Sequence, residues 1–281
     1  MLSVSDHRRD SAGFTYVYPV LSRRAGGLSV GINLNPNSAC NWRCIYCQVP
    51  GLRRGAAPPI DLALLRRELR QLLTDVAQGD FYDRFEVPVA HRVLRDIAIS
   101  GNGEATTAAE FPAVVEIIGD AHGEFGLACG CKLVLISNGS QARRSGVLDG
   151  LRNWARFGGE MWFKLDRTTA EGSARINGVR LDPATLHANL ASAAAVCPVW
   201  LQTCVFRLDR QPPDHAERTA YLEFLAAALA AGVRLEGVLL YGLARPSQQP
   251  EAPRLDRLPA EWLEAFAAEI GTLGLPVRVS P

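Results

Sequence analysis

Three cysteines stand close together near the front of the chain, and their spacing points to a metal cluster. The run Cys40-Asn-Trp-Arg-Cys44-Ile-Tyr-Cys47 supplies three thiolates from one short loop. A four-iron, four-sulfur cluster needs one ligand on each iron, so three cysteines leave one iron open to a ligand from outside the protein. The spacing therefore favours a [4Fe-4S] cluster, with Cys40, Cys44 and Cys47 as metal ligands and catalytic residues.

Other uses of closely spaced cysteines fit the sequence less well. A structural zinc ion takes four ligands, and no histidine or fourth cysteine lies near Cys47. Haem attachment requires C-x-x-C-H, but Gln48 follows Cys47. A disulfide framework suits a short secreted chain, whereas this chain has 281 residues and shows no apolar signal segment. We therefore expect a reducing, cytoplasmic setting and keep zinc as an alternative.

Four further cysteines are scattered over other parts of the chain and follow no ligand spacing. They are Cys129, Cys131, Cys197 and Cys204. Free thiols are common in protein cores. We expect these four to be core thiols, with a second cluster as the alternative.

The composition indicates an ordinary globular protein. Hydrophobic residues make up 48% of the chain, enough for a sizeable core, and the formal net charge is +1. No apolar run approaches the roughly 18 residues of a spanning helix, so we expect no membrane insertion, and the charge indicates no strong field for nucleic acids. Lysine occurs only as Lys132 and Lys164, and Lys164 lies in a predicted strand, where it needs a polar partner.

Short apolar runs alternate with longer amphipathic stretches, which predicts a parallel sheet with helical crossovers. The expected strands are 28–34, 96–100, 132–137, 161–166, 199–206 and 235–241. The clearest expected helices are 62–76, 107–119, 183–195 and 214–231. The count alone permits a barrel or an open doubly wound sheet, but polar groups follow nearly every strand, as in barrel enzymes. We therefore predict an α/β fold, a partial (βα)6 TIM-like barrel.

Three regions follow from this pattern. We expect an N-terminal extension over 1–27, a core barrel over 28–245, and a C-terminal loop, helix and strand over 246–281 packed on the barrel. The aromatic stretch 14–19 could form an extra strand, a lid or a simple packing arm. The segment 79–91 reads as an irregular insert before the second strand.

The cysteine run, with aromatic Tyr46 before its last cysteine, resembles the signature of the radical SAM superfamily. That resemblance implies a partial barrel of six units and an open iron that chelates S-adenosyl-L-methionine. The run Gly101-Asn102-Gly103-Glu104 after the second strand resembles the family's glycine-rich element, which binds the methionyl amino group. Glycines let backbone carbonyls approach the ammonium, and Glu104 adds negative charge.

The later strands carry less specific signals. Asn138 contacts the cofactor or only forms a turn. By the resemblance, Lys164 and Asp166 lie where the family contacts the ribose or carboxylate of the cofactor, and a mutual salt bridge is the alternative. Gln202 and Tyr241 face the barrel interior if the strand phases are right, or serve as core polar groups.

Within the superfamily, the chain resembles the wyosine tRNA-base synthetase-like group over roughly residues 15 to 280. The shared features include the run from Gly31 to Asn35, the Ser100–Glu104 turn and the strand 163–166. That group carries extra cysteines upstream for a second cluster, whereas no cysteine precedes Cys40. The wyosine reaction and its pyruvate Schiff base are therefore not expected.

The resemblance implies reductive cleavage of S-adenosylmethionine to a 5′-deoxyadenosyl radical, with electrons from a donor such as flavodoxin or ferredoxin. The substrate could be RNA, a small molecule or a peptide. Arginines near the expected barrel mouth would suit RNA: Arg23, Arg24, Arg53, Arg54 and Arg245. The alternative function is a non-catalytic iron-sulfur protein that senses redox state or carries electrons.

Overall fold

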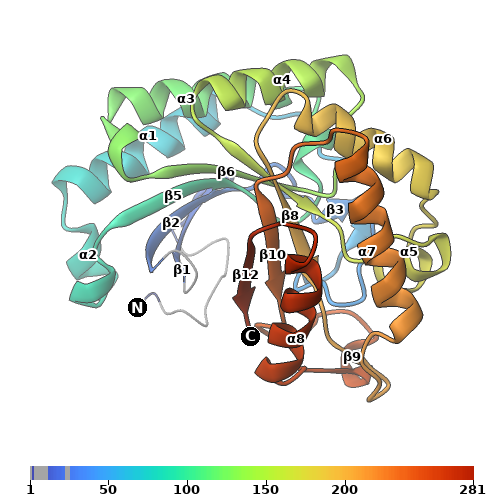
Figure 1. The fold of residues 1–281 in the computed structure, drawn as a ribbon. Coiled ribbons are helices and arrows are strands. Elements are labelled where there is room, and N and C mark those ends of the chain that lie inside the picture. Colours follow the sequence, from blue (N-terminus) through green and yellow to red (C-terminus); the bar gives the residue numbers. More distant parts are fainter. Residues whose placement is uncertain (1, 3–11, 23–25) are drawn as a thin grey trace.

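The computed structural model describes residue 2 and residues 12–22 and 26–281, and its main feature is a single curled sheet of eight strands (Figure 1). The strands lie in the order β1-β2-β5-β6-β7-β8-β10-β12. Their bounds are β1 Val17–Ser22, β2 Gly27–Ile32, β5 Leu94–Ile99, β6 Lys132–Ser137, β7 Glu160–Lys164, β8 Val199–Cys204, β10 Gly237–Tyr241 and β12 Val277–Ser280. Two short sheets pair β3 (Ala39–Cys40) with β4 (Arg53–Arg54), and β9 (Arg207–Leu208) with β11 (Leu255–Asp256).

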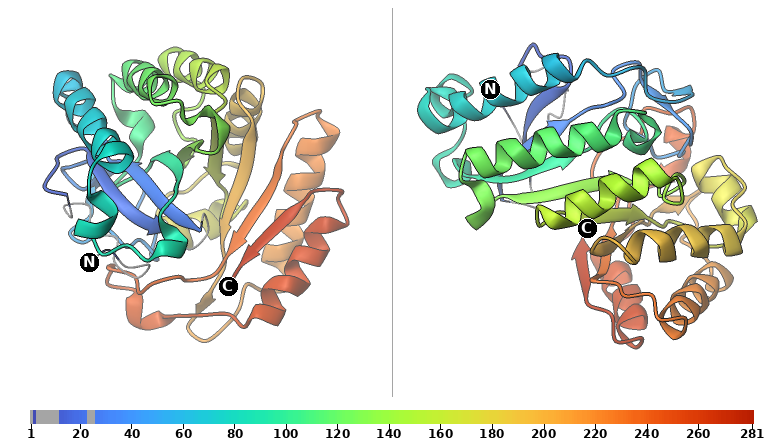
Figure 2. Two further views of the ribbon diagram at one scale, coloured as in Figure 1. Left: turned by 90° about the vertical axis from the view of Figure 1, so that its left-hand side faces the viewer. Right: turned by 90° about the horizontal axis from the view of Figure 1, so that it is seen from above.

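The strand order follows the chain, which gives the sheet the topology of an open barrel. β1 pairs antiparallel with β2, and every later strand pairs parallel with its neighbour. The sheet curls, and its edge strands β1 and β12 do not pair with each other, as Figure 2 shows. The predicted partial (βα)6 barrel is confirmed, and the aromatic stretch 14–19 contributes to the extra strand β1.

The longer helices cover the outer, convex face of the sheet, whereas the short helices α2 (Phe81–Arg84) and α5 (Ala170–Asn177) lie at its ends (Figures 1 and 2). The bounds of the longer helices are α1 Leu62–Gln78, α3 Phe111–Glu124, α4 Ser145–Arg156, α6 Pro183–Ala194, α7 His215–Ala230 and α8 Ala260–Gly271. The start of α1 illustrates why they form, because the Asp61 side chain caps it by accepting from the Leu64 N–H at 2.9 Å. Leu65, Leu69 and Leu72 then place an apolar stripe against the sheet.

Alternation along the strands divides their side chains between two faces. In β7, Met161 and Phe163 point into the core beneath the helices, whereas Trp162 and Lys164 are only half-buried. Because successive side chains of a strand point to opposite sides, the second pair lies on the inner, concave face. The inner face therefore carries the polar groups that the parallel strands bring to one end.

Several segments differ from the sequence-based expectation. The helix expected from 107 begins at Phe111, after a 3-10 turn at Ala105–Thr107, because Glu104 caps that turn. The insert 79–91 holds α2 and a 3-10 turn, Val89–His91. The C-terminal strand does more than pack on the barrel, since β12 extends the main sheet beside β10. Much of the expected extension 1–27 lies outside the described residues. No helix among the described residues is long and apolar enough to cross a membrane.

Candidate active site

The cysteine run forms an ordered loop, residues 40–47, here called the cluster loop, at the carboxyl end of β2. Ile45 and Tyr46 anchor it, because both are buried in a small hydrophobic cluster that includes Phe206 and Leu243. The rings of Tyr46 and Phe206 lie 5.5 Å apart. The apolar residues between the cysteines therefore point inward. The three cysteines are free and keep partial exposure.

Two of the cysteine sulfurs already receive N–H donors from the protein. The Trp42 backbone N–H donates to Cys40 Sγ at 3.4 Å, and Asn177 Nδ2 donates to Cys44 Sγ at 3.2 Å. Burial raises the pKa of Cys40 to about 11 and of Cys44 to about 12. Because metal binding requires thiolates, loading these sulfurs with iron must release protons.

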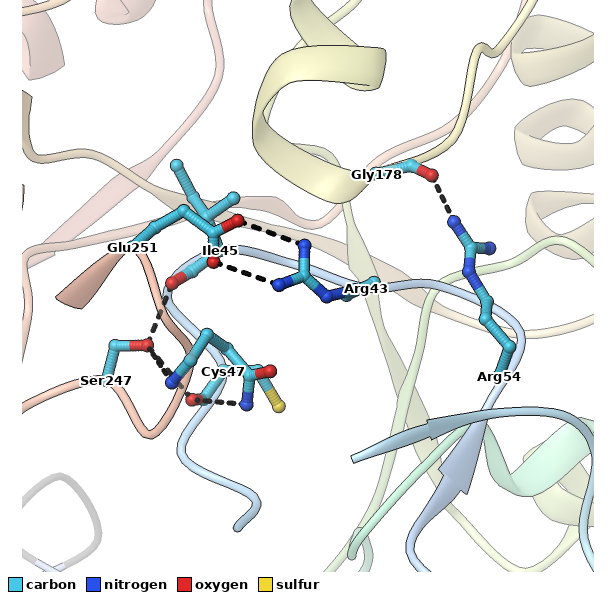
Figure 3. A network of polar contacts seen from close by, with 8 residues as sticks. Arg43, Ile45, Cys47, Arg54, Gly178, Ser247 and Glu251 are labelled. Carbon is cyan, nitrogen blue, oxygen red and sulfur yellow. Dashed lines mark hydrogen bonds and ion pairs between the residues drawn. The ribbon is translucent and has the colours of Figure 1, made fainter. Parts of the chain in front are cut away.

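Segments far away in the chain hold the cluster loop from two sides (Figure 3). On one side, Arg43 forms a bidentate ion pair with Glu251, with N–O distances of 3.0 and 3.2 Å. The Ser247 hydroxyl lies 2.8 Å from the Ile45 carbonyl and 3.2 Å from that of Cys47. On the other side, Arg54 donates to the carbonyls of Asn41 and Gly178. Sequence reasoning missed these tethers.

The glycine-rich turn after β5 packs directly on the start of the cluster loop. A Cβ at Gly103 would lie 1.9 Å from the Ala39 carbonyl oxygen, and one at Gly101 would lie 2.3 Å from Asn33 Oδ1. The Asn102 N–H donates to that same Asn33 oxygen at 3.0 Å. Positions 101 and 103 therefore require glycine, because neighbouring atoms leave no room for a Cβ. This requirement holds with or without a bound cofactor.

Asn33 and Asn35 are site residues that sequence reasoning did not single out. Both are almost fully buried, and Asn35 Nδ2 donates to the Ala39 carbonyl at 2.9 Å. The alternation Asn33-Leu34-Asn35 was the available signal, because two asparagines two positions apart after a strand face the same side.

Glu104 is buried, and its carboxylate accepts four hydrogen bonds. The donors are the Thr106 N–H and hydroxyl, the Ser137 hydroxyl and the Asn138 N–H. The carboxylate therefore joins the turn after β5 to the end of β6. Its expected contact with the cofactor ammonium stays a prediction, and its role between the two strand ends was missed.

Asn138 forms the turn that the sequence suggested and also reaches the cluster loop. Its Oδ1 accepts from the Ser140 N–H at 3.0 Å, which closes the turn, and its Nδ2 donates to Asn41 Oδ1 at 2.8 Å. Asn41 in turn donates to the Ser140 hydroxyl at 2.7 Å. A direct contact between Asn138 and a cofactor stays a prediction.

Lys164 lies in a polar and aromatic setting on the inner face. Its Nζ donates to the Tyr241 hydroxyl at 3.1 Å and sits 5.0 Å from the centre of the Tyr46 ring. Burial alone would lower the pKa of Lys164, but neighbouring acidic groups, Tyr241 and Asp166 first, raise it well above its usual value. The ammonium therefore stays charged at neutral pH.

Asp166 is buried and holds neighbouring residues in place. Its carboxylate accepts from the Tyr46 hydroxyl, from Asn177 Nδ2 at 2.7 Å and from the Cys204 N–H at 2.9 Å. Desolvation, followed by the nearby Asp166, raises the pKa of Tyr46 well above its usual value. Lys164 and Asp166 form no ion pair in the described part of the chain, so the salt-bridge alternative is wrong.

Gln202 and the expected rim arginines are the remaining residues that the sequence suggested. Gln202 is buried on β8, in register with Lys164 on β7. Arg245 donates to Gln48 Oε1 at 3.2 Å, beside the cluster loop. The expected rim residues Arg23 and Arg24 lie outside the described residues.

The remaining cysteines do not join the site as a group. Cys131 and Cys197 precede β6 and β8 at the opposite ends of those strands, and Cys129 is exposed, whereas Cys204 ends β8. Among the described residues, no three His, Cys, Asp or Glu side chains converge on one ion position. A four-iron cluster does not require such convergence at the cluster loop, since each cysteine binds a different iron.

Comparison with known proteins places this chain among solved structures that share one fold. No family model matches the chain, and no curated protein matches it. TYW1 with a lysine-pyruvate adduct shares 16% identity at a TM-score of 0.55, covering 87% of this chain and 73% of that one. A radical SAM methyltransferase from Sphaerobacter thermophilus shares 17% at 0.55, covering 94% and 68%. Streptococcus suis SuiB bound to S-adenosylmethionine shares 11% at 0.55, covering 91% and 47%. The chain therefore has the radical SAM fold that its cysteine run and glycine-rich turn predicted.

Proposed function

We propose that this chain is a radical SAM enzyme that binds a [4Fe-4S] cluster at Cys40, Cys44 and Cys47 and S-adenosylmethionine at the open iron. The observation that supports it best is the cluster loop itself. Three partly exposed cysteines share one loop at the carboxyl end of the barrel, and N–H groups already point at two of the sulfurs. Such donors suit anionic sulfur, so the residues present fit the cluster.

The cluster and the cofactor, when bound, supply a one-electron cleavage that yields methionine and a 5′-deoxyadenosyl radical for hydrogen abstraction. The chain's own residues bind and orient. In this proposal Gly101, Asn102 and Gly103 present backbone to the methionyl ammonium. The charged Lys164 side chain holds the cofactor carboxylate or ribose, since charge-assisted hydrogen bonds are the strong ones. Asp166 acts through Tyr46 and Asn177, which it fixes in place.

A lysine-pyruvate adduct is not part of this proposal, although one is bound in the TYW1 structure. A lysine must lose its proton before it attacks a carbonyl. The pKa of Lys164 is raised, which opposes that step. The second lysine, Lys132, is exposed beside Glu160 at the end of the sheet opposite the cluster loop, so it is not available to the proposed site.

The proposal leaves the substrate as RNA, a peptide or a small molecule, and it needs a low-potential electron donor such as flavodoxin or ferredoxin. A peptide stays among the candidates because one structure with this fold, that of anSMEcpe, has AdoMet and a peptide bound. Residues 28–245 form the proposed catalytic core, flanked by the extension 1–27 and the segment 246–281. We propose a cytoplasmic location, because free thiols such as those of the cluster loop are kept reduced there.

The deciding experiment is anaerobic reconstitution with iron and sulfide, followed by dithionite and S-adenosylmethionine. We expect 5′-deoxyadenosine and methionine from the wild type and neither from C40A, C44A or C47A, which also lose iron. The matched control is C129A, because Cys129 is exposed and distant from the loop. A wild type that binds the cluster but cleaves no cofactor would favour a redox sensor or electron carrier. Any one of these three variants that kept its cluster and still cleaved the cofactor would refute the site.

A further inference from the structure

The turn that ends α5 follows the backbone of the cluster loop. The Ile45 N–H donates to the Ile176 carbonyl at 2.9 Å, and the Arg43 N–H donates to the Asn177 carbonyl at 3.0 Å. The next carbonyl, that of Gly178, accepts from Arg54, as Figure 3 shows. Gly178 has a φ of +68°, and a Cβ there would lie 2.7 Å from the Arg43 carbonyl oxygen. The turn is thus fitted closely to the loop, with the Asn177 side chain beside Cys44.

The orientation of the Asn177 amide follows from its neighbours. Nδ2 lies 2.7 Å from Asp166 Oδ2 and 3.2 Å from Cys44 Sγ. A carboxylate offers only acceptors, so the amide edge that faces Asp166 must be the NH2 group. One N–H then points at the carboxylate and the other at the sulfur. The Cys204 N–H donates to the other oxygen of Asp166, so the carboxylate that orients the Asn177 amide is itself fixed in place.

Asn177 stands apart from the other donors near the cysteines. The donor to Cys40 is the backbone N–H of Trp42, which a change of side chain other than to proline leaves in place. In the described part of the chain, Asn177 is the one side chain that donates to a sulfur of the cluster loop. It is also 1% exposed, so water does not compete for the contact. The contact is therefore both specific and removable by mutation.

We propose that Asn177 is a positioning residue that sets the reduction potential of the cluster held by Cys44. Hydrogen bonds to the sulfurs are one of the factors that fix the potential of an iron-sulfur cluster. Reduction adds negative charge, and an N–H donor at a ligating sulfur stabilises the more negative state. Asn177 thus raises the potential, and Asp166 keeps its amide oriented for this. The inference rests on the proposed function only in requiring the cluster at these cysteines.

The test compares wild type, N177L and N37L after anaerobic reconstitution, without S-adenosylmethionine. Leucine is close in size to asparagine but donates no hydrogen bond. N37L is the matched control, because Asn37 lies just before the same loop, donates an amide hydrogen bond to the Ala56 carbonyl at 3.1 Å and donates to no cysteine sulfur in the described part of the chain. Iron and sulfide are quantified first, and the midpoint potential is then measured by a redox titration followed by electron paramagnetic resonance.

We expect N177L to keep its cluster. The equilibrium constant for one-electron reduction of that cluster should fall about tenfold, which shifts the midpoint potential by about 59 mV to a more negative value. N37L should keep the wild-type potential. Equal potentials in N177L and wild type would overturn the inference while leaving the proposed function intact. If N177L binds no iron, N177S decides by the same titration, because its shorter side chain cannot span Asp166 and Cys44 together. A wild type without any cluster would instead refute the proposed function.

Discussion

Replacing Glu104 by glutamine tests whether this buried carboxylate joins two strand ends. The substitution keeps the shape but turns one oxygen into an NH2 group, which cannot accept a hydrogen bond. The best orientation keeps the amide oxygen toward Thr106 and Ser137, which places the NH2 group opposite the Asn138 N–H. At least one buried backbone donor then loses its acceptor.

The magnitude follows from the number of donors left without a partner. One buried donor without an acceptor costs about 1 to 3 kcal/mol, so E104Q should lower the free energy of unfolding by that amount. E104A removes the acceptor of two backbone N–H groups, those of Thr106 and Asn138, and should cost about 2 to 6 kcal/mol. The two hydroxyl donors can rotate toward other acceptors and add less.

Urea unfolding of the metal-free protein under reducing conditions measures both values. The matched control is E264Q, because Glu264 is an exposed residue of α8 and its change should stay within about 0.5 kcal/mol. A loss below about 0.5 kcal/mol for E104Q, or a loss for E104A no larger than that for E104Q, would refute the hydrogen-bond count on which the prediction rests.

Three further predictions concern the cluster loop. G103A should lower the free energy of unfolding by about 1 to 3 kcal/mol and reduce iron loading, because the new Cβ would lie 1.9 Å from the Ala39 carbonyl oxygen. A G103A variant with the stability and iron content of the wild type would contradict this. Burial raises the pKa of Cys40 to about 11 and that of Cys44 to about 12. The unfolded chain therefore loses these protons at lower pH than the folded protein, and the free energy of unfolding of the metal-free protein should fall as the pH rises from about 9 toward 11. Urea midpoints of the wild type that stay constant over this range would contradict the prediction. S247A should cost about 1 to 3 kcal/mol in urea unfolding. The single hydroxyl hydrogen of Ser247 is shared between the Ile45 and Cys47 carbonyls, and its oxygen accepts from the Gln249 N–H. Unchanged stability would show that these hydrogen bonds are dispensable.

Most of the sheet could be predicted because its signals are local. The run from Lys132 to Ser137 is apolar and bounded by glycine and a turn, and it forms β6 over those residues. Helix α4 was not among the clearest helical patterns, because Gly146 and Gly150 interrupt its apolar repeat. The structure gives a reason for the second glycine, since a Cβ at Gly150 would lie 2.6 Å from the ring of Phe111 on α3. That requirement comes from tertiary packing, which the local sequence does not contain.

In the candidate site too, residues in short local patterns could be predicted, and residues that meet only through the fold could not. The spacing of the cysteines and the glycines after β5 are short-range patterns, so they could be found in one sequence. Asn177 and Ser247 could not, because they meet Cys44 and Cys47 across 133 and 200 residues of chain. A single asparagine at the end of a short helix, or a serine in a proline-rich loop, has many ordinary uses. Only the topology brings these residues to the cluster loop.

The parallel sheet explains how one loop comes to be held by such distant segments. The turn after β5, the end of α5 and the segment after β10 all follow the carboxyl ends of strands or their crossovers, and these ends lie along one rim. Several contacts use backbone alone, as where Ile45 and Arg43 donate to the end of α5. Backbone contacts demand no particular side chain, which is consistent with a fold shared at 11 to 17% identity. The side-chain contacts of Asn177, Ser247 and Glu251 are therefore where this chain can set properties of its own.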